Sequence, residues 1–152
     1  MNREEILRIL DANFNRSREG LRVCEEITRF VMQDERLTRD LKKARHEVSE
    51  CLKVFPVGVS ELVAARDSKN DVGREPSSLE KGRRGTQELF LANMERSKEA
   101  LRALEEVSKL IDDNKISNRF KKIRFSVYSI EKKVIKKLEA LRNHRLDRKS
   151  VV

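Results

Sequence analysis

The sequence has few of the residues that interrupt regular secondary structure. Its 152 residues include two prolines and five glycines, and all five glycines lie between residues 20 and 85. A β-rich protein of this length would need turn residues along the whole chain, so an all-α fold is expected. No run of about 18 apolar residues occurs, which excludes a typical transmembrane helix. Charged residues among the first ten exclude a signal peptide, and a cytoplasmic location is expected.

Cysteine is also scarce. Cys24 and Cys51 lack the spacing of a metal site, and each falls within a helical apolar pattern. We therefore interpret both as reduced residues of a hydrophobic core.

Charge, in contrast, is abundant and uneven. Charged residues make up 40% of the chain and its net charge is +9. Between Arg119 and Lys149 there are twelve lysines or arginines and three acids, so the excess belongs to the C-terminal segment. Such a basic helix can bind nucleic acid or phosphates, or be a solvated face. With one tyrosine and no tryptophan, the solvated face is favoured and nucleic acid is not the expected partner.

Two segments of the chain match each other at an offset of 80 residues. Nine residue types of the first segment recur in the second. They are Ala12, Asn13, Arg16, Ser17, Glu19, Leu21, Arg22, Glu25 and Glu26, matched by Ala92, Asn93, Arg96, Ser97, Glu99, Leu101, Arg102, Glu105 and Glu106. After one deleted residue the similarity resumes, since Arg45 matches Arg124. A helical hairpin that occurs twice is therefore predicted.

Capping residues and chain breaks set the expected boundaries. Asn2 with Glu5, and Ser77 with Glu80, are signatures of helix N-termini. Helices are expected at about 3–33, 36–54, 78–112 and 115–145, with a short helical turn near 60–65. The chain is then a single domain, residues 1–152, with hairpins at about 3–54 and 78–145 and a connecting loop at about 55–77. Burial of the apolar stripes predicts a four-helix bundle with an approximate internal twofold.

Polar residues interrupt the apolar face of the first helix. At about 100° per residue, Ile6, Cys24 and Val31 lie at the middle of that face. Asn13 and Ser17 fall on the same line and Arg16 at its edge, and Asn93, Ser97 and Arg96 repeat the arrangement. The interior is therefore expected to contain either a hydrogen-bond network that fixes helix register or a pocket for a phosphorylated small molecule.

The segment 65–75 of the connecting loop gathers acids and bases around a glycine. Carboxylates on a turn can hold Mg²⁺ and arginines can hold phosphate oxygens, although a solvated linker has the same composition. Arg83 and Arg84 follow and could reach the same region. Neither a phosphate-binding loop nor a dinucleotide-binding fingerprint occurs, so a familiar nucleotide-binding fold is not indicated.

Several runs of the sequence resemble a small bacterial family. They are residues 10–26, Arg29-Phe30, Lys43-Ala44-Arg45-His46, Arg66-Asp67, Asp71-Val72-Gly73 and residues 92–106. The family is the hydroxymethylpyrimidine-phosphate kinases, which stand alone or are fused ahead of thiamine-phosphate synthase. The resemblance covers roughly residues 5–112.

The resemblance implies transfer of a phosphoryl group from ATP, with Mg²⁺, to hydroxymethylpyrimidine monophosphate. We expect Asp67 and Asp71 to hold Mg²⁺, and Arg66 to neutralise phosphate charge in the transition state. The expected substrate site consists of Asn13, Arg16, Asn93 and Arg96, with Arg45, Arg83 and Arg84 as further phosphate-binding candidates. A fused or associated synthase and a homodimer are the expected protein partners. Alternatives are a basic nucleic-acid-binding module and a non-catalytic dimerisation or regulatory domain of a synthase.

Overall fold

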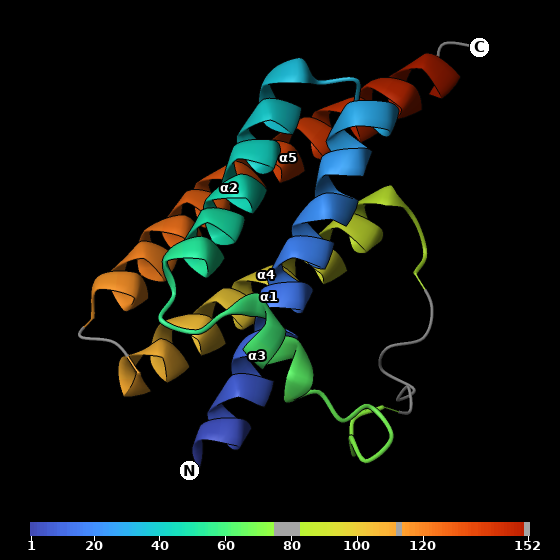
Figure 1. Cartoon of the computed structure of the whole chain (residues 1–152). Helices are drawn as coiled ribbons and strands as arrows, with labels where there is room; N and C mark the ends of the chain where they lie inside the picture. Colours follow the sequence, from blue (N-terminus) through green and yellow to red (C-terminus); the bar gives the residue numbers. More distant parts are fainter. Residues whose placement is uncertain (75–82, 112–113, 151–152) are drawn as a thin grey trace.

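The computed structural model describes residues 1–74, 83–111 and 114–150, and these ranges contain helices and no strand. The four long helices are α1 (Arg3–Glu26), α2 (Glu35–Val54), α4 (Thr86–Val107) and α5 (Lys115–Ser150) (Figure 1). Three short elements accompany them: the π-helical η1 (Ile27–Val31), α3 (Val59–Ala64) and the 3₁₀ turn η3 (Ser108–Leu110). The all-α prediction is confirmed. None of the described helices is long and apolar enough to cross a membrane.

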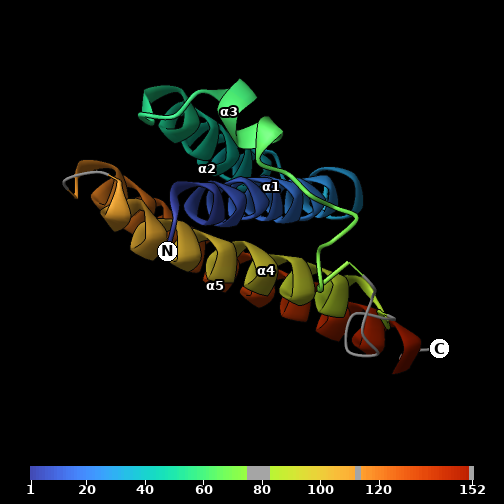
Figure 2. The same cartoon turned by 60° about the horizontal axis from the view of Figure 1, so that its bottom comes forward.

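The long helices form two hairpins that pack against each other. Figure 2 shows α1 and α2 in one layer, with α3 beside them, and α4 and α5 in the other. Helix α1 crosses α4 at the centre of the molecule, and α2 contacts α5. Each amphipathic stripe is thereby covered by the opposite hairpin, which is the helical bundle that the repeat predicted.

The first helix begins as predicted and the third does not. At the start of α1, the Asn2 side chain accepts from the Glu5 amide at 2.9 Å, and Glu5 accepts in return from the Asn2 amide. Helix α4 starts at Thr86 after non-helical residues 83–85, so the prediction of one continuous helix over about 78–112 is wrong. Gly85 has a φ of 157°, a non-helical conformation that favours glycine, so the helix begins only at the next residue. The predicted cap of Ser77 with Glu80 lies outside the described residues.

The end of the first helix also differs from expectation. Ile6 and Cys24 are buried as predicted, but Val31 is 55% exposed. The Met32 amide donates to the Ile27 carbonyl at 3.0 Å, an i→i+5 bond. A π-turn advances less around the axis per residue than an α-helix, so residues after Glu26 leave the apolar line. Met32 is buried in place of Val31.

The Phe14 side chain packs against residues of both hairpins in the core. It is 1% exposed, and its ring makes edge contacts with Phe55 at 5.8 Å and with Phe120 at 5.7 Å between centroids. Phe55 follows α2 and Phe120 belongs to α5, so one side chain of α1 contacts both neighbours. Edge-to-face pairs of this kind add about 0.5–1.5 kcal/mol to the burial of the rings.

The crossing of α1 and α4 is a close approach of two backbones. The Ser97 hydroxyl donates to the Ser17 carbonyl at 3.1 Å, and both residues are fully buried. A Cβ atom on Gly20 would stand 2.6 Å from the Asn93 carbonyl oxygen and would also collide with the Ser97 hydroxyl. Glycine is therefore required at residue 20 by the space between the helices.

The two hairpins repeat the same internal contacts. Within the first, the Arg45 Nε lies 2.8 Å from the Glu25 carboxylate, and within the second the Arg124 Nε lies 2.9 Å from Glu105. Both carboxylates are buried, at 5% and 4% exposure. The sequence repeat therefore corresponds to a structural repeat, since each arginine anchors the second helix of its hairpin to the first.

Candidate functional site

A pocket of about 670 Å³ opens between the N-terminal half of α1 and the loop that follows α3. Five of the predicted site residues line it. These are Asn13 and Arg16 from α1, and Arg66, Asp67 and Asp71 from the loop. Two segments about fifty residues apart in the sequence therefore form one polar cavity.

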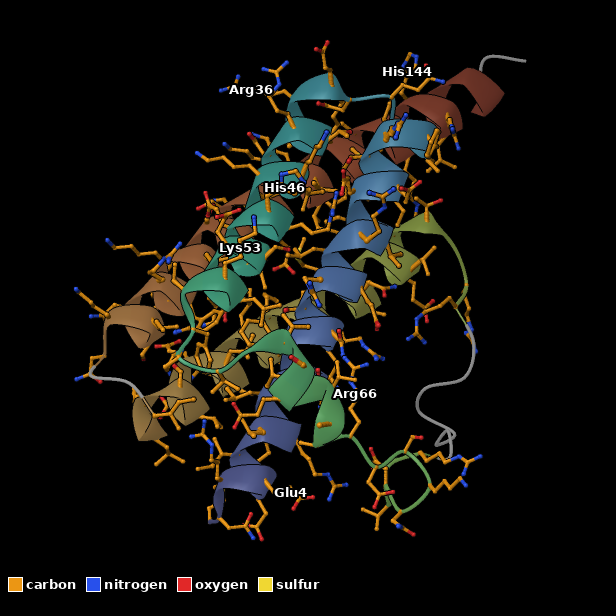
Figure 3. All side chains as sticks on the ribbon, viewed as in Figure 1. Glu4, Arg36, His46, Lys53, Arg66 and His144 are labelled. Atoms are coloured by element: carbon orange, nitrogen blue, oxygen red, sulfur yellow. The ribbon has the colours of Figure 1, made fainter. Side chains whose placement is uncertain are left out.

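Helix α3 places the loop against α1. Leu62 of α3 is 2% exposed and Ala65 at its end is 7% exposed, so the short helix is held by apolar contacts. At its outer edge, Glu61 accepts from the Arg3 guanidinium of α1 at 2.9 Å. The chain leaves α3 at Ala65, and the next residue, Arg66, lies beside α1 (Figure 3).

Arg66 is fixed by a residue that the sequence did not single out. Its Nε and Nη2 donate to the two carboxylate oxygens of Asp11 at 2.6 and 2.8 Å. Asp11 is 8% exposed, and the hydrogen bond to it raises the pKa of Arg66 above its ordinary value. A bidentate pair sets the plane of the guanidinium group as well as its position. Asp11 therefore orients Arg66 on the wall of the pocket.

A signal for Asp11 existed in the repeat. Its counterpart 80 residues later is Leu91, whereas the neighbouring Ala12 and Asn13 are both matched. The acid thus breaks the repeat at the place where the loop after α3 approaches the first hairpin.

The two loop carboxylates are held in place by local hydrogen bonds. Asp67 accepts from the Asn70 side chain at 2.8 Å and from its amide at 3.2 Å. These hydrogen bonds lower the pKa of Asp67, and the bond from the Asn70 side chain contributes most. The positive charge of Arg8 makes a smaller contribution in the same direction. Asp71 accepts from the Gly73 amide at 2.8 Å. The hydrogen bonds from Asn70 thus favour the ionised form of Asp67, which is the form that binds a cation.

Two further arginines line the same pocket. Arg8 and Arg16 come from one face of α1, and neither has a carboxylate within ion-pair distance in the described parts of the chain. An arginine without an acidic partner at the edge of a cavity can bind a phosphate oxygen. The pocket therefore contains both anionic and cationic groups, as a site for a metal-bound phosphate requires.

The other predicted residues do not line this pocket. Arg45 is bound to Glu25, Arg96 lies 3.9 Å from Glu19, and the Asn93 side chain donates to the Leu89 carbonyl at 2.9 Å. Arg83 and Arg84 precede α4, and Arg84 lines a separate groove. The two repeats thus do not contribute equally to one central site.

The inner polar residues of α1 divide between a closed helix contact and the border of the pocket. Ser17 and Ser97 belong to the closed contact between α1 and α4. Asn13 donates to the Ile9 carbonyl at 2.8 Å and also borders the pocket, where its side-chain oxygen remains an acceptor. The hydrogen-bond network and the pocket are therefore neighbours on α1.

Neither histidine belongs to the pocket. Figure 3 shows His46 on α2 and His144 near the end of α5, away from Arg66. Among the described residues, no group of three or more histidines, cysteines and acids is arranged to hold a metal ion. The prediction that Asp67 and Asp71 hold Mg²⁺ therefore rests on the chemistry of two carboxylates that line the pocket.

The all-α bundle and its polar pocket define a small helical protein with a candidate phosphate site. Residues 8–133 match the model of the ThiD2 family, and the chain belongs to that family. It is 40% identical over 127 residues to a thiamine-phosphate synthase of Synechocystis sp., covering 83% of this chain and 35% of that protein. It is 34% identical over 137 residues to a thiamine-phosphate synthase of Rhodopirellula baltica, covering 90% of this chain and 36% of that protein.

The chain spans about a third of the length of the curated relatives it matches. A thiamine-phosphate synthase of Nostoc punctiforme has the same proportion, with 40% identity over 83% of this chain and 34% of that protein. No solved structure matches the chain.

Proposed function

We propose that this protein is an ATP-dependent kinase of thiamine biosynthesis that converts hydroxymethylpyrimidine monophosphate to the pyrophosphate. Membership of the ThiD2 family and relatives named thiamine-phosphate synthase support the pathway. One observation carries the proposed reaction. Arg66, Asp67 and Asp71 of the loop share a pocket with Asn13 and Arg16 of α1.

The acceptor in this reaction is already an anionic phosphate oxygen, so no strong general base is needed. Catalysis then consists of aligning donor and acceptor and neutralising the charge between them. Arg66 supplies a fixed positive charge because Asp11 holds its guanidinium group from one side. Arg8 and Arg16 supply positive charge from α1, and Asn13 offers an amide to the pyrimidine.

Asp67 and Asp71 fit a magnesium ion that arrives with the nucleotide. Mg²⁺ bound to nucleotides typically takes one or two protein carboxylates, and phosphate and water oxygens fill its other positions. The hydrogen bonds from Asn70 favour the ionised carboxylate of Asp67. When bound, the ion neutralises charge on the phosphates of ATP. The loop also positions Asp67 through Asn70, so the ligand does not depend on the metal for its orientation.

The same residues would give the kinase a preference for the monophosphate over the free alcohol. Arginines that bind the acceptor phosphate would be left facing water or one another if the substrate had no phosphate. A site built to pair with a charged group rejects an analogue without it by a factor of about 10⁴–10⁵ in favourable cases.

The test is a coupled kinase assay with ATP, Mg²⁺ and either hydroxymethylpyrimidine or its monophosphate. Turnover is expected with the monophosphate alone. A folded protein that turns over neither compound, or both equally, would contradict the proposal.

A non-catalytic domain of a thiamine-phosphate synthase is the second candidate, because the chain spans about a third of relatives with that name. It predicts no turnover in the assay above and a change in synthase activity when the two are combined. The structure supports nucleic-acid binding less well, because part of the positive charge of α5 is already paired with acidic side chains. Arg124 binds Glu105, and Lys137 binds Asp34 of the first hairpin.

A further inference from the structure

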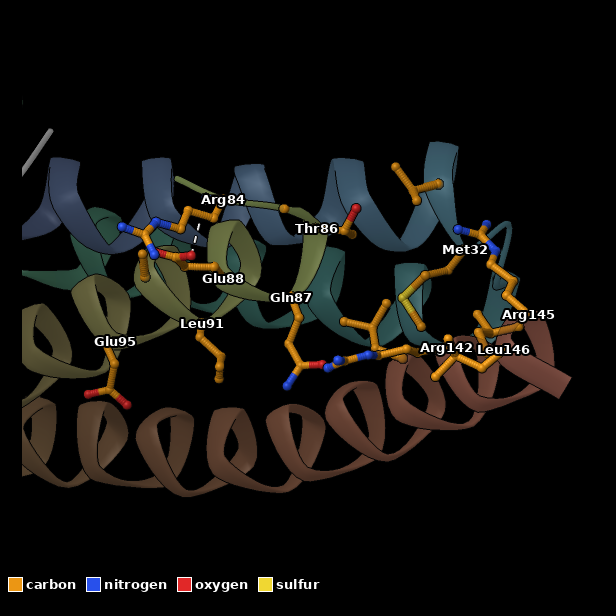
Figure 4. Close-up of a pocket in the computed structure, with 15 residues that line it drawn as sticks. Met32, Arg84, Thr86, Gln87, Glu88, Leu91, Glu95, Arg142, Arg145 and Leu146 are labelled. Atoms are coloured by element: carbon orange, nitrogen blue, oxygen red, sulfur yellow. Dashed lines mark hydrogen bonds between the residues drawn. The ribbon is translucent and has the colours of Figure 1, made fainter. Parts of the chain in front are cut away.

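A second cavity lies between the start of α4, the C-terminal part of α5 and the end of η1 (Figure 4). This groove has a volume of about 850 Å³. Aliphatic side chains form much of its surface: Met32 and Leu138 are buried, and Leu141 is 39% exposed. Apolar surface in a concave site of this size is typical of pockets for small molecules.

Three arginines add positive charge to the groove. Arg84 precedes α4, and Arg142 and Arg145 project from α5 (Figure 4). Within the described ranges, none of the three has a carboxylate at ion-pair distance.

The acids of the groove do not balance this charge. Glu95 is paired with Lys98, and Glu88 accepts from the backbone amide of Arg84 at 3.1 Å. One acid therefore faces three arginines beside an apolar surface, which favours an anionic ligand with an apolar body.

The repeat relates this groove to the polar pocket. Leu91, Ala92 and Glu95 line the groove, and their counterparts Asp11, Ala12 and Asn15 line the pocket. The two cavities share no lining residue, so they can be occupied at the same time. The polar pocket beside α1 therefore has the charged Asp11 at the position where the groove beside α4 has the apolar Leu91.

We propose that the groove is a second binding site, for an organic anion with a flat apolar ring, the chemistry of a nucleoside phosphate. The ring would lie on Met32, Leu138 and Leu141, and the phosphates on Arg142 and Arg145. A second copy of this chain is a poorer occupant, because a symmetric contact through this face would bring the arginines of both copies together. The site does not depend on the proposed kinase reaction, which uses the other cavity.

Photolabelling of the whole chain with 8-azido-ATP locates the site directly. Labelled peptides from residues 84–95 and 138–146 are expected, together with saturable binding. Label confined to residues 5–16 and 66–71, or no saturable labelling, would overturn the proposal.

Matched variants separate this groove from a general attraction to the basic helix. The double variant Arg142→Gln/Arg145→Gln should weaken binding of 8-azido-ATP at these two segments about tenfold or more, measured from their labelled peptides at increasing probe concentration. Leu141→Glu should weaken it to a similar degree with the arginines intact, since it places a carboxylate on the apolar surface.

Lys121→Gln/Lys122→Gln is the control, because it removes two charges from exposed positions of the same helix. Thermal melts verify that each variant is folded. Equal weakening by the lysine control would overturn the proposal. Displacement of the label by an acidic peptide but not by ATP would likewise overturn it, in favour of a protein partner.

Discussion

Arg45 of α2 donates to the Glu25 carboxylate of α1 through Nε at 2.8 Å and Nη2 at 3.4 Å, across twenty residues of sequence. Glu25 is 5% exposed, whereas its neighbour Glu26 is half-buried and pairs with Arg22 along the same helix. The second pair is set by the i,i+4 spacing of one helix, whereas the first joins the two helices of the hairpin.

Glu25→Gln should therefore destabilise the protein, because Arg45 loses a buried ionic partner. We expect a loss of about 2 kcal/mol in the free energy of unfolding, measured by urea denaturation. Glu26→Gln is the control, with an expected change below about 0.5 kcal/mol because an ion pair at the protein surface contributes little. Equal effects of the two substitutions would contradict the role given to Glu25.

Gly20→Ala should destabilise the protein even though alanine favours helices. The new methyl group would collide with Ser97 and the Asn93 carbonyl, and we expect a net loss of about 1–3 kcal/mol. Gly58→Ala provides the contrast, because its φ is −72° and no atom lies within 4 Å of the added carbon. Thermal unfolding of both variants measures the difference, and a stabilised Gly20→Ala protein would exclude the close approach.

Asp67→Asn/Asp71→Asn should abolish turnover of the monophosphate while the fold remains, because neutral amides are poor ligands for Mg²⁺. Circular dichroism and the kinase assay measure the two properties separately. Full activity in the double variant would remove the metal assignment but leave the pocket itself in place.

Asp11→Asn tests the anchoring of Arg66. With the carboxylate gone, the guanidinium group is no longer fixed, and kcat should fall about tenfold to a hundredfold with a smaller change in KM. Glu4→Gln, an exposed acid of the same helix that does not line the pocket, should leave both constants unchanged. If KM for the monophosphate alone rose after Asp11→Asn, Arg66 would act in substrate binding rather than in the transition state.

Cys24 should make the protein less stable at alkaline pH. The pKa of this thiol is raised from 9.0 to about 12, mainly by burial and secondly by the negative charge of Glu131. The unfolded state loses the proton first, so the contribution of Cys24 is complete below pH 9 and is lost between about pH 9 and 12. Over that range the free energy of unfolding should fall by up to about 1.4 kcal/mol per pH unit. Urea denaturation at pH 8, 9 and 10 measures it, with Cys24→Ala as the reference; identical slopes would contradict the prediction.

Much of the fold follows from the repeat, because identical residues at one offset demand equivalent helices. Asn2 and Glu5 set the start of the first helix from local chemistry alone. Val31 could not be placed in this way, since a π-turn changes the helical phase and no residue type announces it. The start of α4 was also misjudged, because the effect of Gly85 depends on the backbone conformation it adopts.

The candidate site was predictable where chemistry is local and not where it depends on the approach of distant segments. Asp67 and Asp71 stand out as acids beside a glycine in a loop. In the sequence, Asp11 cannot be told from a solvent-exposed acid of a helix. Its role depends on the fold, because the chain after α3 places Arg66 beside it. Arg45 does not line the pocket of Arg66 for a related reason, since its partner Glu25 lies on another helix.

The hydrogen bond from Ser97 to Ser17 joins two residues that are counterparts in the repeat, so it lies on the approximate twofold axis. A contact between a position and its own equivalent is the mark of an isologous interface between identical subunits. The boundary between the hairpins is thus the interface of a symmetric dimer contained in one polypeptide. In a true dimer every substitution occurs twice, whereas in a single chain one half can change alone. Asp11 opposite Leu91 is a substitution of this kind, and it allows one protein to have two related cavities with different chemistry.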